Sequence, residues 1–436
     1  MKNIQFSDFG SKLCGPSGIN QLMDDLGKPL PKDIPLSLMG GGNPARIPQV
    51  ESMYRQQMEK IISNGDEFEN LIGRYDSPQG RTSFIESVAD YLSKKYGWPI
   101  SAENIAITNG SQSAFFYLFN MFCGTYTNNG IAKKKRIVFP LVPEYVGYAD
   151  QGIEFDCFTG IHADFSKFDN HTFKYHINFD LLEQHLKESD DVAGLCVSRP
   201  TNPTGNVLTD TEIQKLSKIA QDYDIPLFID NAYGLPWPNI IFTDEATPYW
   251  DSNVILSMSL SKIGLPSLRT GIIIAQKEII TAISRLNAIA ALASGSIGQA
   301  LASDLIANGN LVQIAKDCVK PFYKNKSEFA QKMIHNYFAG TNYYIHKSEG
   351  AIFLWLLLED LTVSTKELYQ MLKAKGVFVM PGEYFFFGNK NDSSLPKVEE
   401  HPHFSKCIRL NYGGSQEQVE YGIKTIAELY KQLSVR

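Results

Sequence analysis

The strongest constraint on the fold is a regular alternation between about residues 100 and 290. There, short and almost wholly apolar runs are separated by helical patterns. The predicted strands are 104–108, 136–140, 193–197, 226–230, 254–258 and 271–275. Strands that alternate with helices indicate parallel pairing, and strands that are apolar on both faces indicate burial between two helical layers. The sequence therefore predicts an α/β unit with a mainly parallel sheet.

The pattern changes after about residue 310, which indicates a second unit. The predicted elements are a long helix at 311–336, a strand at 351–358, a helix at 365–375, a strand at 377–380 and a terminal helix at 415–433. A chain of 436 residues also exceeds the size at which one core usually stops growing. We predict a large domain at 51–310, a small α+β domain at 311–436, and a segment at 1–50 that packs with the small domain. The polar stretch 388–402 is expected to be disordered.

Composition narrows the class of function. Lys and Arg total 41 against 47 Asp and Glu, so a net charge of −6 gives no basic excess for nucleic acid. Residues 1–8 lack the pattern of a signal peptide, and no apolar run is long enough to span a bilayer. The six cysteines lack metal-site or disulfide spacing. We expect a cytoplasmic protein that acts on small molecules without a metal.

Lys262 is the first candidate for chemistry. The segment Ser259-Leu-Ser-Lys262 follows a predicted strand, and ligands of open α/β sheets bind at the carboxyl ends of strands. A nucleophilic lysine needs a lowered pKa, to which the nearby Arg269 would contribute. The alternative is a solvated lysine at a strand end.

Asp230 and Asn202 also follow predicted strands. A buried carboxylate such as Asp230 needs a partner, and the protonated nitrogen of a pyridine ring would serve; a helix cap is the alternative. Asn202 lies in a turn rich in Pro, Asn and Gly, where its side chain could donate to a phenolate oxygen or be purely structural.

A fourth candidate is the strand-to-helix junction at Ser111 and Gln112. Small and hydroxyl side chains at a helix N-terminus favour phosphate, although Ser111 could be a simple N-cap. All four candidates lie at carboxyl ends of predicted strands. From Asn202 to Asp230 is 28 residues and from Asp230 to Lys262 is 32, each roughly one βαβ step. We therefore expect one site at one edge of the sheet.

These motifs resemble those of a known family. Asn202-Pro-Thr-Gly205, Asp230-x-x-Tyr233 and Ser259-x-Ser-Lys262 followed by an arginine are similar to the motifs of fold-type I aminotransferases, which depend on pyridoxal 5'-phosphate (PLP). Within that family the chain resembles the valine–pyruvate group from about Phe9 to the terminal helix, through segments 40–45, 108–119, 143–149, 197–206, 257–266 and 346–355. The resemblance implies a large domain with a mainly parallel seven-stranded sheet and a smaller α+β domain.

The resemblance also implies roles for the cofactor-binding residues. Lys262 would hold PLP as a Schiff base and later move the substrate's proton, and Asp230 would pair with the ring nitrogen. The ring would have Asn202 and Tyr233 on its phenolate oxygen, and Tyr145 stacked on its face. The residues implied at the phosphate are Ser111, Gln112, Ser259, Arg269 and, from a neighbouring subunit, Tyr75. The loop before Arg269 reads Pro266-Ser-Leu and is shorter than in many relatives, which puts that contact in doubt.

The implied substrates are amino acids and 2-oxoacids. Arg409 would bind the α-carboxylate, with Gly41, Asn43 and Asn202 nearby, and Ile19 and Tyr145 would line the side-chain pocket. The expected reaction is ping-pong transfer between L-valine or L-alanine and pyruvate or 3-methyl-2-oxobutanoate, by a homodimer with shared sites.

Other readings stay open at this point. The enzyme could act on other neutral amino acids, or could be a PLP-dependent lyase or decarboxylase on the same fold. A transcription regulator with an aminotransferase-like domain would need an N-terminal DNA-binding domain, for which the sequence leaves no room. A non-catalytic scaffold would not need the lysine, aspartate and arginine together.

Overall fold

The computed structural model describes residues 5–15, 17, 18, 20, 34–389 and 394–434. Ile19, which was expected in the substrate pocket, lies outside this part of the chain.

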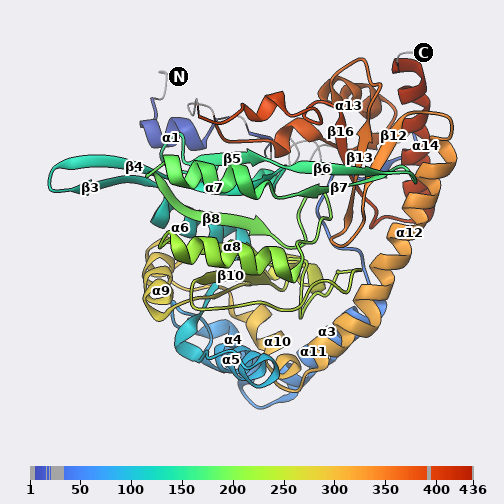
Figure 1. Ribbon diagram of the computed structural model, residues 1–436. Coiled ribbons are helices and arrows are strands. Elements are labelled where there is room, and N and C mark those ends of the chain that lie inside the picture. Colours follow the sequence, from blue (N-terminus) through green and yellow to red (C-terminus); the bar gives the residue numbers. More distant parts are fainter. Residues whose placement is uncertain (1–4, 16, 19, 21–33, 390–393, 435–436) are drawn as a thin grey trace.

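A large mixed sheet forms the centre of the molecule, in the order β2-β11-β10-β9-β8-β4-β3, with β5 also paired to β4. Its strands are β2 (Ile105–Thr108), β3 (Gly124–Asn128), β4 (Ile131–Val142), β5 (Phe158–His162), β8 (Val192–Ser198), β9 (Leu227–Asp230), β10 (Val254–Ser259) and β11 (Gly271–Ile274). From β10 through β9, β8 and β4 to β5 the pairing is parallel, and β11 is antiparallel to both neighbours. The six predicted strands and the mainly parallel sheet are confirmed. The count is eight rather than seven because β3 pairs with the outer part of β4, and this hairpin projects from the body (Figure 1).

Helices cover both faces of this sheet. They include α6 (Ser111–Phe122), α7 (Phe179–Glu188), α8 (Asp210–Asp222) and α9 (Lys277–Ala291). In Figure 1, α7 and α8 lie in front of the sheet, and α6 lies behind it. Helix α8 illustrates the local rules: Thr209 and Glu212 form a capping box at its start, and Ile213 and Leu216 are buried on its inner face.

A second, six-stranded sheet has the order β15-β16-β13-β12-β7-β6. Its strands are β6 (Asp164–Phe168), β7 (Thr172–His176), β12 (Tyr343–His346), β13 (Phe353–Leu358), β15 (Met380–Pro381) and β16 (Cys407–Asn411). The hairpin β6–β7, from the middle of the chain, was not predicted, and its strand β7 pairs in parallel with β12. This hairpin therefore joins the C-terminal sheet to the part of the chain that builds the large sheet.

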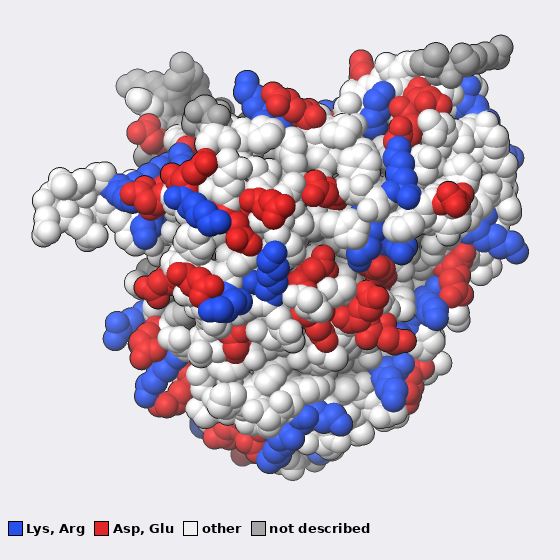
Figure 2. All heavy atoms as spheres, in the orientation of Figure 1, with Lys and Arg blue, Asp and Glu red and all other residues white. Residues whose placement is uncertain are grey.

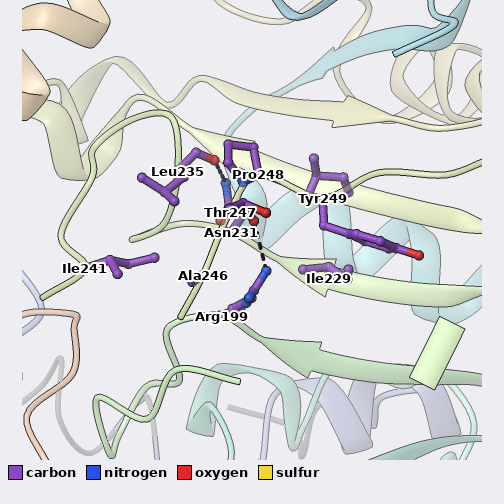
Figure 3. A pocket seen from close by; sticks show the side chains of 10 residues that line it. Arg199, Ile229, Asn231, Leu235, Ile241, Ala246, Thr247, Pro248 and Tyr249 are labelled. Carbon is purple, nitrogen blue, oxygen red and sulfur yellow. Dashed lines mark hydrogen bonds between the residues drawn. The ribbon is translucent and has the colours of Figure 1, made fainter. Parts of the chain in front are cut away.

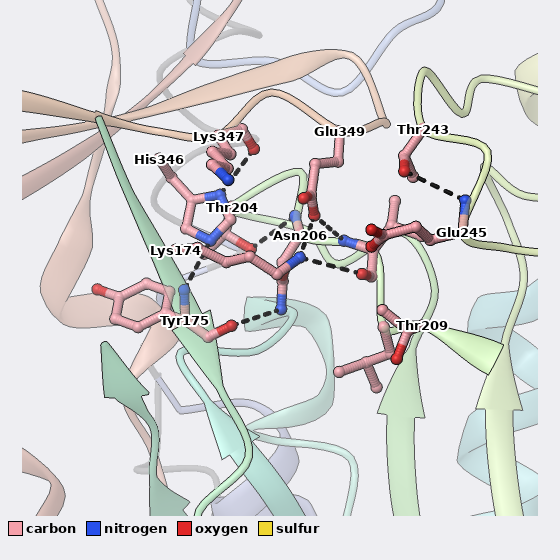
Figure 4. A network of polar contacts seen from close by, with 12 residues as sticks. Lys174, Tyr175, Thr204, Asn206, Thr209, Thr243, Glu245, His346, Lys347 and Glu349 are labelled. Carbon is pink, nitrogen blue, oxygen red and sulfur yellow. Dashed lines mark hydrogen bonds and ion pairs between the residues drawn. The ribbon is translucent and has the colours of Figure 1, made fainter. Parts of the chain in front are cut away.

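A polar network reinforces that junction (Figure 4). Lys174 of β7 forms an ion pair with Glu349, and Glu349 also accepts a hydrogen bond from Val207 N at 3.1 Å. The side chains of Lys174 and Glu349 are only 10% and 14% exposed. Asn206 donates to the carbonyl of Tyr175 at 3.4 Å, so the turn after β8 is tied to the same strand.

The predicted helices of the C-terminal unit are present, with one interruption. They are α11 (Asn310–Ile314), α12 (Lys320–Tyr337), α13 (Thr365–Ala374) and α14 (Gln416–Leu433). A π-helical turn, Ala315–Val319, replaces the expected continuous helix between α11 and α12. Pro321, two residues after this turn, has no N–H to donate to the carbonyl four residues earlier, which accounts for the irregular winding at this point.

The remaining elements surround the two sheets. They are α1 (Asp8–Leu13), β1 (Ser37–Leu38), α3 (Pro48–Ser63), α4 (Glu67–Gly73), α5 (Thr82–Tyr96), α10 (Ser296–Ala307) and β14 (Val377–Phe378). Strand β1 pairs in parallel with β14, which places Ser37 and Leu38 against the C-terminal unit. Helix α1 instead contacts the part of the chain that builds the large sheet, because Lys12 donates to the carbonyls of Gly152 and Glu154.

The stretch 388–402 differs from the expectation of disorder. Residues 390–393 lie outside the described part, but Asn389, Val398 and His401 on either side are buried. Asn389 holds the segment to β5, because its side chain exchanges hydrogen bonds with both the N–H and the carbonyl of Gly160.

The surface carries both charge signs interspersed on the face that Figure 2 shows. Among the described residues, no helix is long and apolar enough to cross a membrane.

Candidate active site

The carboxyl ends of β8, β9 and β10 lie in one row. Ser198, Asp230 and Ser257 are partners across the two parallel pairings. Strand β2 ends at the same edge, because Thr108 and Ser259 both pair with Gly271 of the antiparallel β11. The four candidate motifs predicted from the sequence therefore meet at one edge of the sheet.

Lys262 lies in the short helix η3 (Ser261–Ile263) that follows β10, and its amine faces into the site. Its Nζ donates to the carbonyl of Gly42 at 2.6 Å and lies 5.4 Å from the centre of the Tyr233 ring. Burial, together with the positive charges of Arg409 and Arg269, lowers the pKa of Lys262 to about 8. The alternative of a solvated strand-end lysine is therefore wrong.

Asp230 ends β9 and is 8% exposed. Its Oδ1 accepts from the N–H of Ala232 at 3.0 Å, and its Oδ2 accepts from the Tyr148 hydroxyl. Burial raises the pKa of the carboxyl to about 6. No helix begins here, since residues 231–239 form turns, so the helix-cap alternative is wrong.

The N-terminus of α6 forms an open cradle of N–H groups. Gly110 precedes the helix at φ +86° and supplies no side-chain cap, so Ser111 is the first helical residue rather than the N-cap. A β-carbon at position 110 would overlap the guanidinium of Arg269. Arg269 is thus packed against the start of α6 in spite of the short loop before it, and uncapped N–H groups beside an arginine favour an anion.

Two other residues expected at the phosphate already have protein partners. Ser259 Oγ accepts from the N–H of Ser261 at 3.0 Å. Gln112 Nε2 donates to the carbonyl of Gly147 at 3.0 Å, which ties α6 to the loop that carries Tyr145.

Arg409, on β16, is 2% exposed and has no carboxylate partner within the part that the structure describes. Its Nη1 donates to Asn202 Oδ1 at 2.8 Å and its Nη2 to Gly40 O at 2.6 Å, while Nε is buried without a partner. The Phe353 ring lies 4.1 Å from its Cζ. Burial lowers the pKa of Arg409 to about 10. A buried cation with neutral partners and a free donor is suited to an incoming carboxylate.

Arg199 shows the opposite arrangement, although it is also buried (Figure 3). Its guanidinium donates to Asp210 at 2.7 Å and to the carbonyls of Leu208 and Thr247 at 2.6 and 3.0 Å. The cavity beside it has a volume of about 10 Å³, room for about one water molecule. Arg199 is therefore structural, since its charge is already compensated.

The segment Gly40–Asn43 contacts both cations of the site, because the carbonyl of Gly40 accepts from Arg409 and that of Gly42 from Lys262. Asn411 Nδ2 donates to the carbonyl of Gly41 at 2.7 Å and to that of Asn43 at 3.4 Å. The side chain of Asn411, two residues after Arg409 on the same strand, thus fixes the segment whose Gly42 carbonyl accepts from Lys262. Sequence reasoning missed Asn411, although the alternation of a strand places residues 409 and 411 on one face.

The three predicted tyrosines fall in two places. Tyr145 lies next to the site, and its ring makes an edge contact with that of Tyr148 at 5.1 Å. Tyr233 is 6% exposed and lies beside Lys262. Tyr75, in contrast, is 84% exposed on the connection between α4 and α5, so the structure does not bring it to the site of its own subunit.

Comparisons with known proteins agree with this geometry. Residues 52–426 match the family Aminotransferase class I and II. The chain belongs to this family. It is 45% identical to a valine–pyruvate aminotransferase of Escherichia coli, over 98% of both chains. Among solved structures, a putative amino-acid aminotransferase from Psychrobacter arcticum matches with a TM-score of 0.93 at 43% identity over 99% of both chains. A valine–pyruvate aminotransferase from Salmonella typhimurium matches with a TM-score of 0.83 at 42% identity, over 95% of this chain and 99% of that one.

The family uses PLP, and the residues of this chain fit that cofactor. The start of α6 suits the phosphate, because it has no side-chain cap and because Gly110, which lacks a β-carbon, lets the guanidinium of Arg269 pack beside it. Asp230 presents a buried carboxylate for the ring nitrogen, and Lys262 presents an amine with a lowered pKa for the aldehyde.

Proposed function

We propose that this aminotransferase moves an amino group between L-valine or L-alanine and pyruvate or 3-methyl-2-oxobutanoate. The observation that carries the aminotransferase chemistry is the convergence of Lys262 and Asp230, at one edge of the large sheet, with the uncompensated Arg409 of β16. The likeness to a valine–pyruvate aminotransferase over nearly the whole chain supports the choice of substrates.

Lys262 acts as the base in this proposal. Its amine removes the proton from Cα of the bound amino acid and later returns a proton, which requires the unprotonated form that its lowered pKa provides. When bound, PLP supplies an electron sink for the electron pair left at Cα. Asp230, supported by the Tyr148 hydroxyl, holds a proton on the ring nitrogen and so maintains that sink.

Arg409 orients the substrate. Its guanidinium binds the α-carboxylate, and the free Nε supplies a donor that no protein group uses. Asn202 accepts from Nη1 of Arg409 at 2.8 Å, and it would also contact the phenolate oxygen of the bound cofactor. Holding the carboxylate fixes which bond at Cα faces Lys262, so the arrangement favours loss of the α-proton.

We further propose a homodimer with shared active sites, in a reducing cytoplasm. The 84% exposed Tyr75 is accompanied by the exposed apolar side chains of Ile72, Ile289 and Leu292. Asn287 of α9 donates to the carbonyl of Pro78 at 2.8 Å, so the Tyr75 loop and the end of α9 are neighbours. Such a surface suits a second copy of the chain, from which Tyr75 would reach the phosphate. All six cysteines are free thiols, which suits the compartment.

The deciding experiment follows the visible absorbance of the PLP-loaded protein before and after addition of L-valine, with identification of the released oxoacid. We expect the band to bleach and 3-methyl-2-oxobutanoate to appear in stoichiometric amount. Bleaching by L-alanine but not by L-valine would keep the class and reject the valine assignment.

The same experiment separates the other candidates. Release of ammonia or carbon dioxide would indicate a lyase or a decarboxylase. Absence of any visible band in protein supplied with PLP would reject the proposal as a whole.

A further inference from the structure

Glu144 is a buried carboxylate beside the site to which neither the motifs nor the family resemblance gave a role. It follows β4, is 1% exposed, and precedes Tyr145. Its side chain accepts three hydrogen bonds. Oε1 accepts from the N–H of Tyr145 at 2.7 Å and from the hydroxyl of Ser198, and Oε2 accepts from the N–H of Ser198 at 3.0 Å.

These bonds join two segments that carry cofactor-binding candidates. Ser198 is the last residue of β8 and the strand partner of Asp230. Its carbonyl accepts from the Thr201 hydroxyl at 3.0 Å, which starts the turn that presents Asn202. One carboxylate therefore holds the backbone at Tyr145 on one side and the start of the Asn202 turn on the other.

A third segment meets the same residue. The N–H of Glu144 donates to the carbonyl of Phe385 at 2.9 Å, and the Phe385 ring lies 5.2 Å from Arg409 Cζ. Glu144 is thus hydrogen-bonded to the backbone of Tyr145, to Ser198 before the Asn202 turn, and to Phe385, whose ring lies beside Arg409.

The carboxylate is retained at a cost. Burial, together with the negative charge of Asp230, raises the pKa of Glu144 to about 8 against three hydrogen bonds that lower it. An apolar side chain would avoid this cost but would leave the N–H groups of Tyr145 and Ser198 without acceptors. The arrangement is understandable if the position of these two segments matters for the site.

We propose that Glu144 is a positioning residue that sets the spacing between Tyr145 and the Asn202 turn, and hence the position of the cofactor ring. The inference rests on the proposed function, because it concerns how the chain holds PLP. Tyr145 would stack on the ring and Asn202 would contact its edge, so a shift of either segment would tilt the ring.

The test uses Glu144→Gln, in which an amide NH₂ would face the N–H of Ser198 in place of an acceptor oxygen. Glu154→Gln is the matched control, because Glu154 accepts the N–H and the hydroxyl of one residue, Thr125, in the same way at the base of the β3–β4 hairpin. The readouts are the Kd of the apoprotein for PLP, the visible circular dichroism of the bound cofactor, the thermal midpoint, and kcat and KM for the amino acid.

For Glu144→Gln we expect the Kd for PLP to rise about tenfold, which corresponds to the loss of one or two buried hydrogen bonds. The visible dichroism of the bound cofactor should change, and kcat should fall by a larger factor than KM changes. Glu154→Gln should keep the wild-type Kd and dichroism. A folded Glu144→Gln with wild-type Kd and dichroism would overturn the proposal, even if its thermal midpoint fell.

If Glu144→Gln does not fold, Ser198→Ala removes a single donor from the same carboxylate. It should raise the Kd by about threefold and alter the dichroism in the same direction; an unchanged Kd and dichroism would overturn the proposal. Failure of the wild-type protein to bind PLP is a different result, which would reject the proposed function instead.

Discussion

At the scale of single residues, charge distinguishes the site from the rest of the buried interior. The positive charges of Arg409 and Arg269 act on Lys262, and the carboxylate of Asp230 opposes them, whereas Arg199 is paired with Asp210. An excess of positive charge in a buried site is unfavourable for the empty protein. It becomes favourable when a phosphate and a substrate carboxylate enter, which is the pair of anions that the proposed reaction brings.

The lowered pKa of Lys262 predicts the pH dependence of PLP capture. Only the unprotonated amine reacts with the aldehyde, and the folded chain holds the pKa near 8 instead of the ordinary 10.5. Capture by the apoprotein should therefore accelerate as the pH rises and level off above about pH 8. The Arg409→Leu substitution removes a positive charge and should move this midpoint upward. Stopped-flow absorbance against pH measures both, and a midpoint that stays put or falls in Arg409→Leu would contradict the assignment.

Arg409 also predicts a particular kinetic defect. Arg409→Leu should raise KM for amino acids and oxoacids alike by about 100-fold, since a charge-assisted bidentate contact contributes about 2–3 kcal/mol. Arg409→Lys should recover only part of this loss, because an ammonium cannot bind a carboxylate bidentately. Steady-state kinetics with both half-substrates measures the effect. An unchanged KM in Arg409→Leu would place the carboxylate contact elsewhere.

At the scale of elements, the sequence predicted what local patterns encode. The strands at 254–258 and 271–275 were found as β10 and β11, and helix α6 begins at Ser111, the predicted strand-to-helix junction. The ends of strands located Lys262, Asp230 and Asn202, because carboxyl ends of parallel strands share an edge. The hairpin β6–β7 was missed, since its pairing with β12 joins residues about 170 positions apart and leaves no local signal.

The missed site residues have the same explanation. Tyr148 lies three residues after Tyr145, inside a segment already singled out, but nothing in the sequence shows that its hydroxyl reaches Asp230. Glu144 appears as an ordinary acidic residue until the fold buries it against Ser198. Contacts between loops that follow different strands depend on tertiary packing, so local patterns do not reveal them.

The Lys174–Glu349 ion pair makes the link between the two sheets testable. Removing one partner of a nearly buried pair leaves the other charge uncompensated, so Glu349→Gln should lower the free energy of unfolding by about 3 kcal/mol. The double variant Lys174→Met/Glu349→Gln should recover part of that loss. Urea denaturation measures both values.

The exposed pair Lys94–Asp90 serves as the control for this measurement. Its side chains are 78% and 69% exposed, so Asp90→Asn should cost no more than about 0.5 kcal/mol. If Glu349→Gln costs no more than Asp90→Asn, the junction contributes nothing measurable to stability.

At the scale of the whole molecule, one subunit presents a nearly complete site with one predicted residue pointing away. Lys262, Asp230, Asn202, Tyr233 and Arg409 converge, whereas Tyr75 is 84% exposed beside α9. The proposed homodimer resolves this difference, because a tyrosine unused by its own site is available to a second copy. The proposal predicts more than an association state: each site should need residues from two chains.

Mixed dimers test that requirement directly. Lys262→Ala should be inactive and Tyr75→Ala strongly impaired, each through both of its sites. When the two variants are unfolded together and reassembled, half of the dimers are hybrids, and one site of each hybrid contains both native residues. Activity should then recover to about a quarter of the wild-type value. Wild-type protein mixed with Lys262→Ala provides the reference for reassembly. Activity no greater than the average of the two parents would show that Tyr75 does not contribute to the active site of the second subunit. The exposed surface around α9 would then not be needed for a shared active site.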